Sequence, residues 1–353
     1  MSTQYVAVQW NAQKKRYDGV MGGAVFAFLA TFIATGKLVF PTITDEILIL
    51  RALGTCAFLL LHVVLSIGPL CRLSSRFLPL LYNRRHAGVL LFFLALLHAV
   101  LVIITYHAGG NVSWIHSWMA GNALVPSVAG VPFQFFGFAA LMLLTLMAVT
   151  SHDFWLRHLT APIWKALHMG VYAAYALLVL HVAFGVIQRE RSMVYPLALT
   201  LGATAIFGVH WASARHERHI DGAAPTITSC DTEADEFQDV CALDEIRENR
   251  AKVVMLSGER VAVFRYEGKV SAVSNVCQHQ NGPLGEGKIV NGCITCPWHG
   301  YQYLPDTGAS PPPFVEKIPT FEVRLRGGRV LIHPTPRPAG TRCDPALISP
   351  AIV

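Results

Sequence analysis

The stretch NRRHAGVLLFFLALLHAV at residues 83–100 starts with basic side chains and continues as an apolar run that only His98 interrupts. Apolar runs of similar length recur from about residue 19 to residue 214. A helix needs about 20 mostly apolar residues to cross the hydrocarbon of a bilayer. The whole chain is 53% hydrophobic and only 14% charged, whereas soluble domains carry about 25% charged residues. The first part of the chain is therefore predicted to lie in a membrane.

We expect six transmembrane helices, followed by a soluble part with ordinary polarity. The predicted spans are about 19–40, 47–70, 87–107, 131–149, 164–187 and 194–213. The first run is too long for a cleaved signal peptide, so it is interpreted as a retained helix. The predicted divisions are a membrane domain at 1–215, a polar linker at 216–235, a soluble domain at 236–336 and a tail at 337–353.

Basic residues in the short loops predict the orientation of these spans. Eleven Lys and Arg residues flank one side of the spans and four flank the other. Cytoplasmic loops carry the excess of such residues, so both termini and the soluble domain are expected in the cytoplasm of a multi-pass inner (plasma) membrane protein. Because the basic residues lie scattered between apolar runs, the expected partner is the lipid bilayer and not nucleic acid.

Histidines recur inside the predicted spans, where ionisable groups are costly and usually functional. They are His62, His98, His168, His181 and His210, with His86 at the edge of a span. With a rise of about 1.5 Å per residue, His98 lies roughly 20 Å beyond Arg85, and His181 roughly 24 Å beyond Lys165. These two histidines share a depth, and paired imidazoles bind electron-transfer haem. The depths suggest one haem between them, and leave open a second on His168, which is level with His86 or His210.

The soluble part has short β-rich runs broken by Gly-containing turns, which predicts a small all-β module. Its loops carry Cys277-x-His279 and Cys296-x-x-His299, with sixteen residues between the two boxes. Two thiolates and two imidazoles can hold zinc in a tetrahedral site. The same set can hold a [2Fe–2S] cluster with cysteines on one iron and histidines on the other. Cys293, which precedes Cys296, is interpreted as structural.

Two resemblances sharpen these expectations. Residues 83–100 and WKALHMGVYAAYALLVLH at 164–181 resemble the ferric reductase-like transmembrane family. That family includes the haem subunit of the methionine sulfoxide reductase system and the membrane part of NADPH oxidases. The resemblance implies that His98, His168 and His181 ligate b-type haem. The oxidase branch carries a second histidine fourteen residues from the first on the helix of His98, which this chain lacks, so His86 is the candidate substitute.

The two boxes, with Gly282-Pro283 and CPWHG at 296–300, resemble the Rieske family. The resemblance implies that Cys277 and Cys296 hold the inner iron of a [2Fe–2S] cluster, and His279 and His299 the outer iron. It also implies that SPPPF at 310–314 covers the cluster. Two extra cysteines of high-potential members are absent, and Tyr301 replaces a serine that hydrogen-bonds the cluster. Fewer hydrogen bonds to sulfur lower the reduction potential, so we expect the low end of the roughly −150 to +300 mV range.

The combined expectation is a transmembrane electron-transfer protein of the ferric reductase-like type. A cytoplasmic reductase or ferredoxin would donate electrons at the Rieske module, and a quinone or an outer-face redox protein would accept them after the haem. One alternative is quinol oxidation with a cytoplasmic acceptor. Another is a membrane-tethered redox sensor. A Rieske oxygenase is disfavoured, because such enzymes hold a mononuclear iron in a large further domain and only about 17 residues follow position 336.

Overall fold

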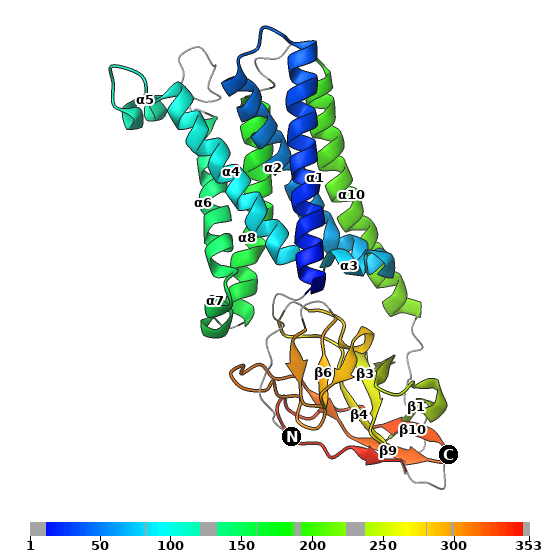
Figure 1. Ribbon diagram of the computed structural model, residues 1–353. Helices are drawn as coiled ribbons and strands as arrows, with labels where there is room; N and C mark the ends of the chain where they lie inside the picture. Colours follow the sequence, from blue (N-terminus) through cyan, green and yellow to red (C-terminus); the bar gives the residue numbers. More distant parts are fainter. Residues whose placement is uncertain are drawn as a thin grey trace. The chain divides into compact units, whose positions relative to one another are not determined.

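The computed structural model describes residues 12–81, 83–120, 133–159, 161–185, 187, 192–223, 237–279, 281–297 and 300–348. The chain forms two compact units. One is helical and is built mostly from residues before His216, and the other holds the β-strands from residue 237 onward. In Figure 1 the helical unit runs from blue to green and the strands from yellow-green to red.

Within the described residues, six main helices make up the helical unit, close to the predicted spans. They are α1 (Ala12–Val39), α2 (Asp45–Leu73), α4 (Arg84–Tyr106), α6 (Gln134–Thr150), α8 (Ala161–Phe184) and α10 (Val194–Ala223). All except α6 are long and apolar enough to cross a membrane. Helix α6 has 17 residues, so the membrane count of six is approximate. Hydrocarbon offers backbone groups no hydrogen-bond partner, which is why apolar runs of this length form helices.

Short helices that the sequence pattern did not predict join the main ones. They are η1 (Ser75–Phe77), α3 (Leu78–Leu81), α5 (Trp114–Ala120) and α7 (Asp153–His158). Helix α2 packs against α1 and α4, and α4 packs against α6. The buried core draws on α2, α4, α6, α8 and α10, and Leu61, Ala140 and Ala174 are fully buried within it. This core holds the helices that carry the candidate haem histidines.

The end of α10 differs from the sequence prediction. The helix continues to Ala223, so residues 216–223 are helical where a linker was expected. The segment RHERHID is polar but contains good helix formers, and the first helix-breaking residues after it are Gly222 and Pro225. The rest of the predicted linker, 224–235, lies outside the described residues.

The β-unit consists of three antiparallel sheets. The first has the order β1 (Gln238–Ala242), β10 (Arg329–Ile332), β9 (Val323–Arg326). The second has the order β11 (Ala346–Leu347), β4 (Lys269–Ser274), β3 (Glu259–Tyr266), β2 (Arg250–Leu256), and β8 (Thr320–Phe321) also pairs with β4. The third has the order β5 (Lys288–Val290), β6 (Cys293–Thr295), β7 (Gln302–Tyr303). Short 3-10 helices η2 (Leu243–Glu245) and η3 (Leu284–Glu286) connect them.

The predicted turns of this unit are confirmed. Strand β3 pairs with β4 so that Tyr266 lies opposite Lys269, which leaves Glu267 and Gly268 as the turn. Both turn residues have positive φ, 47° and 70°. Turns of this type match the right-handed twist of the strands they join. They set the register that directs alternate side chains into the core.

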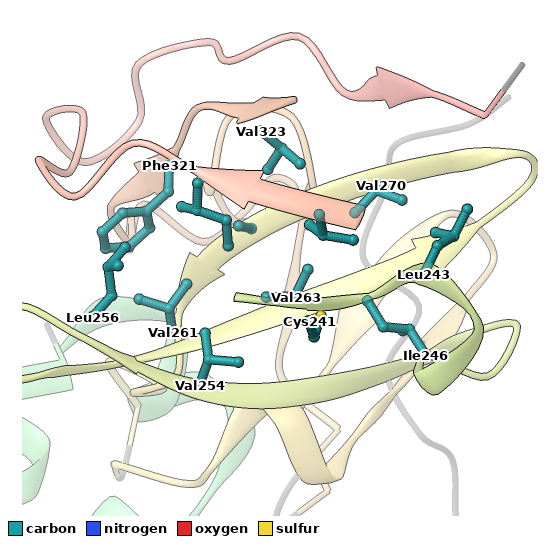
Figure 2. Close-up of a cluster of buried hydrophobic side chains, with 13 residues drawn as sticks. Cys241, Leu243, Ile246, Val254, Leu256, Val261, Val263, Val270, Phe321 and Val323 are labelled. Carbon is teal, nitrogen blue, oxygen red and sulfur yellow. The ribbon is translucent and has the colours of Figure 1, made fainter. Parts of the chain in front are cut away.

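The β-unit has its own apolar core, shown in Figure 2. Val261 and Val263 from β3, Val270 from β4 and Val330 from β10 are all fully buried. Phe321 from β8 packs in the same cluster. The core therefore joins the first two sheets and provides a rigid base for the loops that carry the cysteines.

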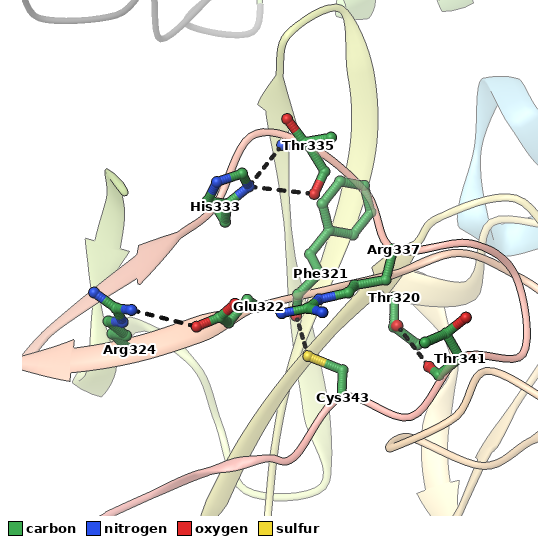
Figure 3. Close-up of polar contacts among 9 residues, drawn as sticks. All are labelled: Thr320, Phe321, Glu322, Arg324, His333, Thr335, Arg337, Thr341 and Cys343. Carbon is green, nitrogen blue, oxygen red and sulfur yellow. Dashed lines mark hydrogen bonds and ion pairs between the residues drawn. The ribbon is translucent and has the colours of Figure 1, made fainter. Parts of the chain in front are cut away.

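The segment predicted to be a tail is part of this unit. Residues Ala346 and Leu347 form β11 on the edge of β4. Figure 3 shows the preceding residues tied to β8, with Thr320 Oγ1 donating to Thr341 O at 3.2 Å and Cys343 Sγ to Phe321 O at 3.4 Å. Each contact satisfies a backbone carbonyl, so the chain through residue 348 closes the sheet and is not a free extension.

Candidate redox sites

Two equivalent loops carry Cys277 and Cys296. The N–H of Cys277 donates to Gly282 O at 3.0 Å, and its carbonyl accepts from Asn281 N at 2.7 Å. The N–H of Cys296 donates to Tyr301 O at 2.8 Å, and its carbonyl accepts from Gly300 N at 3.0 Å. The offsets are identical in the two loops. The sequence therefore folds both boxes into the same compact turn, with each cysteine at its start.

The turns depend on one residue with positive φ in each loop. Asn281 has φ 57° and Gly300 has φ 71°. Glycine adopts this conformation freely, and asparagine adopts it more readily than most other residues. Both residues stand four positions after their cysteine, and each donates the hydrogen bond that closes the loop. This placement explains why a residue that tolerates left-handed backbone follows each box.

The candidate ligands in these loops are buried. Cys277 is 1% exposed, Cys296 2% and His279 4%. Buried thiol and imidazole groups on two such loops are the donor types of a metal or cluster site. His299 lies outside the described residues, and the ligand roles of all four residues stay predictions. Cys293 is also buried, in strand β6, where burial raises the pKa of its thiol. That environment agrees with its interpretation as a structural residue.

Tyr303 is a neighbour of the first loop that the motif spacing did not reveal. Its hydroxyl lies 3.5 Å from Cys277 Sγ and accepts the N–H of Gln278 at 3.0 Å. The side chain is fully buried, and burial followed by the charge of Cys277 raises the pKa of Tyr303. The tyrosine stays protonated, so its O–H is available to the sulfur. The signal in the sequence is the Tyr-Gln-Tyr alternation after the second box, which places both rings on one face.

Tyr301, on the same face, packs against a candidate ligand. Its ring stacks on His279 with centroids 5.2 Å apart and planes 10° apart. Its hydroxyl donates to Glu316 Oε2. Burial and the adjacent Glu316 raise the pKa of Tyr301. Phe314 completes the aromatic group, 4.8 Å from Tyr301, which brings the segment 310–314 to the side of the first loop.

In the helical unit, His98 lies on α4 against α2. Its Nδ1 is 3.0 Å from Leu50 O. A carbonyl only accepts, so Nδ1 carries the proton and Nε2 keeps a lone pair. Gly54 makes room for the ring, because a Cβ there would lie 3.1 Å from His98 Cε1. Metal-ligating histidines usually donate their second nitrogen in this way.

His181, on α8, repeats the arrangement with other partners. Its Nδ1 is 3.1 Å from Phe133 O, at the start of α6. A Cβ at Gly137 would lie only 2.7 Å from that Nδ1, so the close approach requires glycine. Each of these two histidines thus directs one ring nitrogen to a carbonyl of another element, and their pairing around a haem stays a prediction.

Two other span histidines use both ring nitrogens inside the protein. His62 Nδ1 lies 2.8 Å from Phe58 O, and Nε2 accepts from Tyr175 at 3.1 Å. His210 is held in the same way, by Ile206 O at 2.9 Å and by Tyr172 at 3.1 Å. Both tyrosines belong to α8. These histidines tie α8 to its neighbours, and their nitrogens are already used.

His168 and His86, the candidates for a second haem, have separate partners. His168 Nε2 is 3.4 Å from Ser151 Oγ. His86 Nδ1 is 2.8 Å from Asp18 Oδ2 on α1. A carboxylate on Nδ1 leaves Nε2 of His86 able to bind a metal. Both haem sites remain predictions.

Known proteins resemble the chain in two separate parts. A family model described as the Rieske [2Fe-2S] domain matches residues 236–322, and one described as the ferric reductase like transmembrane component matches 52–179. The chain joins a ferric reductase-like transmembrane domain to a Rieske domain. The ferric reductase-like match includes His98 and His168 and ends two residues before His181.

Individual relatives divide between the same two parts. The alkene monooxygenase ferredoxin component of Xanthobacter autotrophicus is 31% identical over 29% of this chain and 85% of that protein. The methionine-sulfoxide reductase heme-binding subunit MsrQ of Herminiimonas arsenicoxydans is 31% identical over 44% of this chain and 68% of that protein. Among solved structures, the carbazole 1,9a-dioxygenase ferredoxin of Nocardioides aromaticivorans is 27% identical over 28% of this chain and 98% of that chain, with a TM-score of 0.27.

The Rieske domain supports a [2Fe–2S] cluster, and its loops fit one. Cys277 and Cys296 offer two buried sulfurs, and His279 a buried imidazole, from loops of the same shape. The two matched domains together support transmembrane electron transfer and a multi-pass membrane protein. The ferric reductase-like domain makes haem plausible, since its relative MsrQ is a heme-binding subunit.

Proposed function

We propose that this protein moves electrons across the membrane, from a cytoplasmic donor at the Rieske domain to an acceptor at the outer face. Support comes from two redox-type domains on one chain. The orientation follows the excess of Lys and Arg on the side of both termini. The proposed location is the inner (plasma) membrane, with the Rieske domain in the cytoplasm.

In the Rieske domain, Cys277 and Cys296 would hold the inner iron, and His279 and His299 the outer iron. The cluster supplies one-electron chemistry when bound. The loops keep the sulfurs buried, and Tyr303 directs its hydroxyl toward Cys277. The domain thereby excludes water from the sulfur side.

In the membrane domain, His98 and His181 would hold a b-type haem through Nε2. One observation carries this assignment. Each ring donates Nδ1–H to a backbone carbonyl of another element and packs against a glycine, whereas His62 and His210 spend both nitrogens within the protein. His168 would serve a second haem, with His86 as its candidate partner. The carbonyl contacts of His98 and His181 fix the orientation of the Nε2 atoms that would bind the haem.

The proposed partners follow from this direction. A cytoplasmic reductase or ferredoxin would donate electrons, and a quinone or an outer-face redox protein would accept them.

One finding favours a second candidate function, in which electrons flow in the opposite direction. Several relatives of the Rieske part are ferredoxin components of oxygenase systems, which suggests a soluble protein that accepts electrons from the cluster. A membrane quinol would then be the donor.

Liposomes that contain the purified chain and enclose ferricyanide test the proposal. Dithionite added outside reduces the cluster directly, and ferricyanide inside should lose its colour only when the chain is present. Cys296→Ser and His181→Ala should each abolish the reaction. His210→Gln, a histidine with both nitrogens used, should retain it. Equal rates with the chain and with empty liposomes would contradict transmembrane transfer.

A further inference from the structure

One side chain, that of Tyr301, separates the carboxylate of Glu316 from the proposed cluster ligand His279. Its Oε2 accepts the hydroxyl of Tyr301 and also the N–H of Val315 at 3.2 Å. Tyr301 in turn stacks on His279, with ring centroids 5.2 Å apart. The carboxylate is therefore fixed relative to the imidazole through a single, fully packed ring.

The surrounding backbone holds this carboxylate in place. Glu316 O accepts the N–H of Ser310 at 2.9 Å, which closes the loop that contains 310–314. Phe314 of that loop packs on Tyr301 at 4.8 Å. Tyr301 is only 3% exposed, so the ring cannot move away from Glu316 without disturbing the loop. The Tyr301–Glu316 pair thus connects the second cysteine loop to the proline-rich loop.

The contact also decides where the Tyr301 hydroxyl points. A serine at this position would donate to the cluster, by resemblance to high-potential Rieske domains. Here the hydroxyl is a donor to Glu316. Since an O–H donates only one hydrogen, the bond to Glu316 takes it away from any other acceptor. The structure therefore replaces a donor by a negative charge in the surroundings of His279.

A negative charge near a redox centre favours the oxidised form, because reduction adds a further electron. This interaction is strong where the connecting atoms are buried and little screened by salt. We propose that Glu316, through its hydrogen bond with Tyr301, is a positioning residue that sets the reduction potential of the Rieske cluster to a low value. The inference rests on the proposed ligands Cys277, His279, Cys296 and His299.

An EPR-monitored redox titration of the full chain in detergent tests this role. Glu316→Gln keeps the size and an acceptor oxygen but removes the charge, and should shift the midpoint potential of the cluster to a more positive value. Glu267→Gln is the matched control. Glu267 is exposed in the turn between β3 and β4, at the opposite end of β4 from Cys277, and its substitution should leave the potential nearly unchanged.

A second variant keeps the test valid if Glu316→Gln fails to assemble a cluster. Tyr301→Phe retains the ring on His279 but frees Glu316 into water, and should shift the potential in the same direction by a smaller amount. An intact EPR signal with no larger shift for Glu316→Gln than for Glu267→Gln would overturn the inference alone. If Glu316→Gln holds no cluster, an unmoved potential in Tyr301→Phe overturns it. Absence of the signal from the unmodified chain would overturn the ligand assignment and this inference together.

Discussion

The Rieske domain and the membrane domain position their candidate ligands by different means. In the Rieske domain, Cys277 and Cys296 each start a short loop closed by its own backbone hydrogen bonds. In the membrane domain, His98 and His181 belong to different helices, and each depends on a carbonyl and a glycine supplied by another element. A local loop can be recognised from residue spacing, whereas a site between helices depends on packing that the spacing does not contain.

The largest expected effect concerns the Rieske domain, whose cysteine loops are closed by their own backbone hydrogen bonds. Cys296→Ser should eliminate the cluster completely, because a serine oxygen is a poor substitute for a thiolate on iron. The iron content and the EPR signal of the purified chain measure this loss. The membrane domain should keep its haem absorbance. Cys293→Ser should retain the cluster, and loss of the signal in that control would mean that Cys293 also serves the site.

The next effect tests the assignment of the histidines. His98→Ala or His181→Ala should each remove most of the haem absorbance at the reduced α-band, since one imidazole holds haem much more weakly than two. His62→Gln and His210→Gln should keep it, because their nitrogens bond to Tyr175 and Tyr172. Optical spectra per milligram of protein give the measurement. A normal spectrum in His181→Ala would refute the assignment.

Glycine substitutions sharpen the comparison, because they change only the supporting elements. Gly137→Ala would place a Cβ 2.7 Å from His181 Nδ1, and Gly54→Ala would place one 3.1 Å from His98 Cε1. The first should lower haem occupancy several-fold, and the second less, in line with the closer contact. Gly208→Ala, where a Cβ meets nothing within 4 Å, is the control. Equal occupancy in all three variants would contradict the proposed support.

The smallest effect concerns one hydroxyl in the Rieske domain. Tyr303→Phe removes the O–H that lies 3.5 Å from Cys277 Sγ. A hydrogen bond to sulfur stabilises the more negative reduced cluster, so its loss should lower the midpoint potential. An EPR-monitored titration shows the shift. A shift to more positive potential would indicate that Tyr303 acts through a contact other than the sulfur.

The sequence predicted the Rieske loops well, because their chemistry is contained in a few consecutive residues. Cys277, His279 and Cys296 lie in loops of the β-unit, where the sequence pattern placed them, while their roles as ligands stay predictions. The sequence did not predict Tyr303 or Glu316, whose contacts come from β7 and from a loop that returns after it. Contacts of this kind depend on how the strands pair, and the motif spacing does not encode that pairing.

In the membrane domain, hydropathy predicted most helices, whereas the pairing of His98 with His181, which depth along the helices suggested, stays a prediction. The spacing of the histidines along their helices does not show which partners each ring nitrogen meets. That depends on Phe133, Gly137 and the tyrosines of α8, which only the packed bundle brings into contact. The end of α10 and the role of residues 337–348 were also misjudged, because polar segments can continue a helix or close a sheet.

The most direct test of the central claim is the optical and EPR spectrum of the purified full chain, oxidised and after dithionite. The account predicts reduced b-type haem bands together with a Rieske-type EPR signal from the same protein. Titration of both signals would then give the direction in which electrons flow downhill. A cluster signal without haem would contradict the transmembrane electron path and leave a membrane-tethered ferredoxin or sensor.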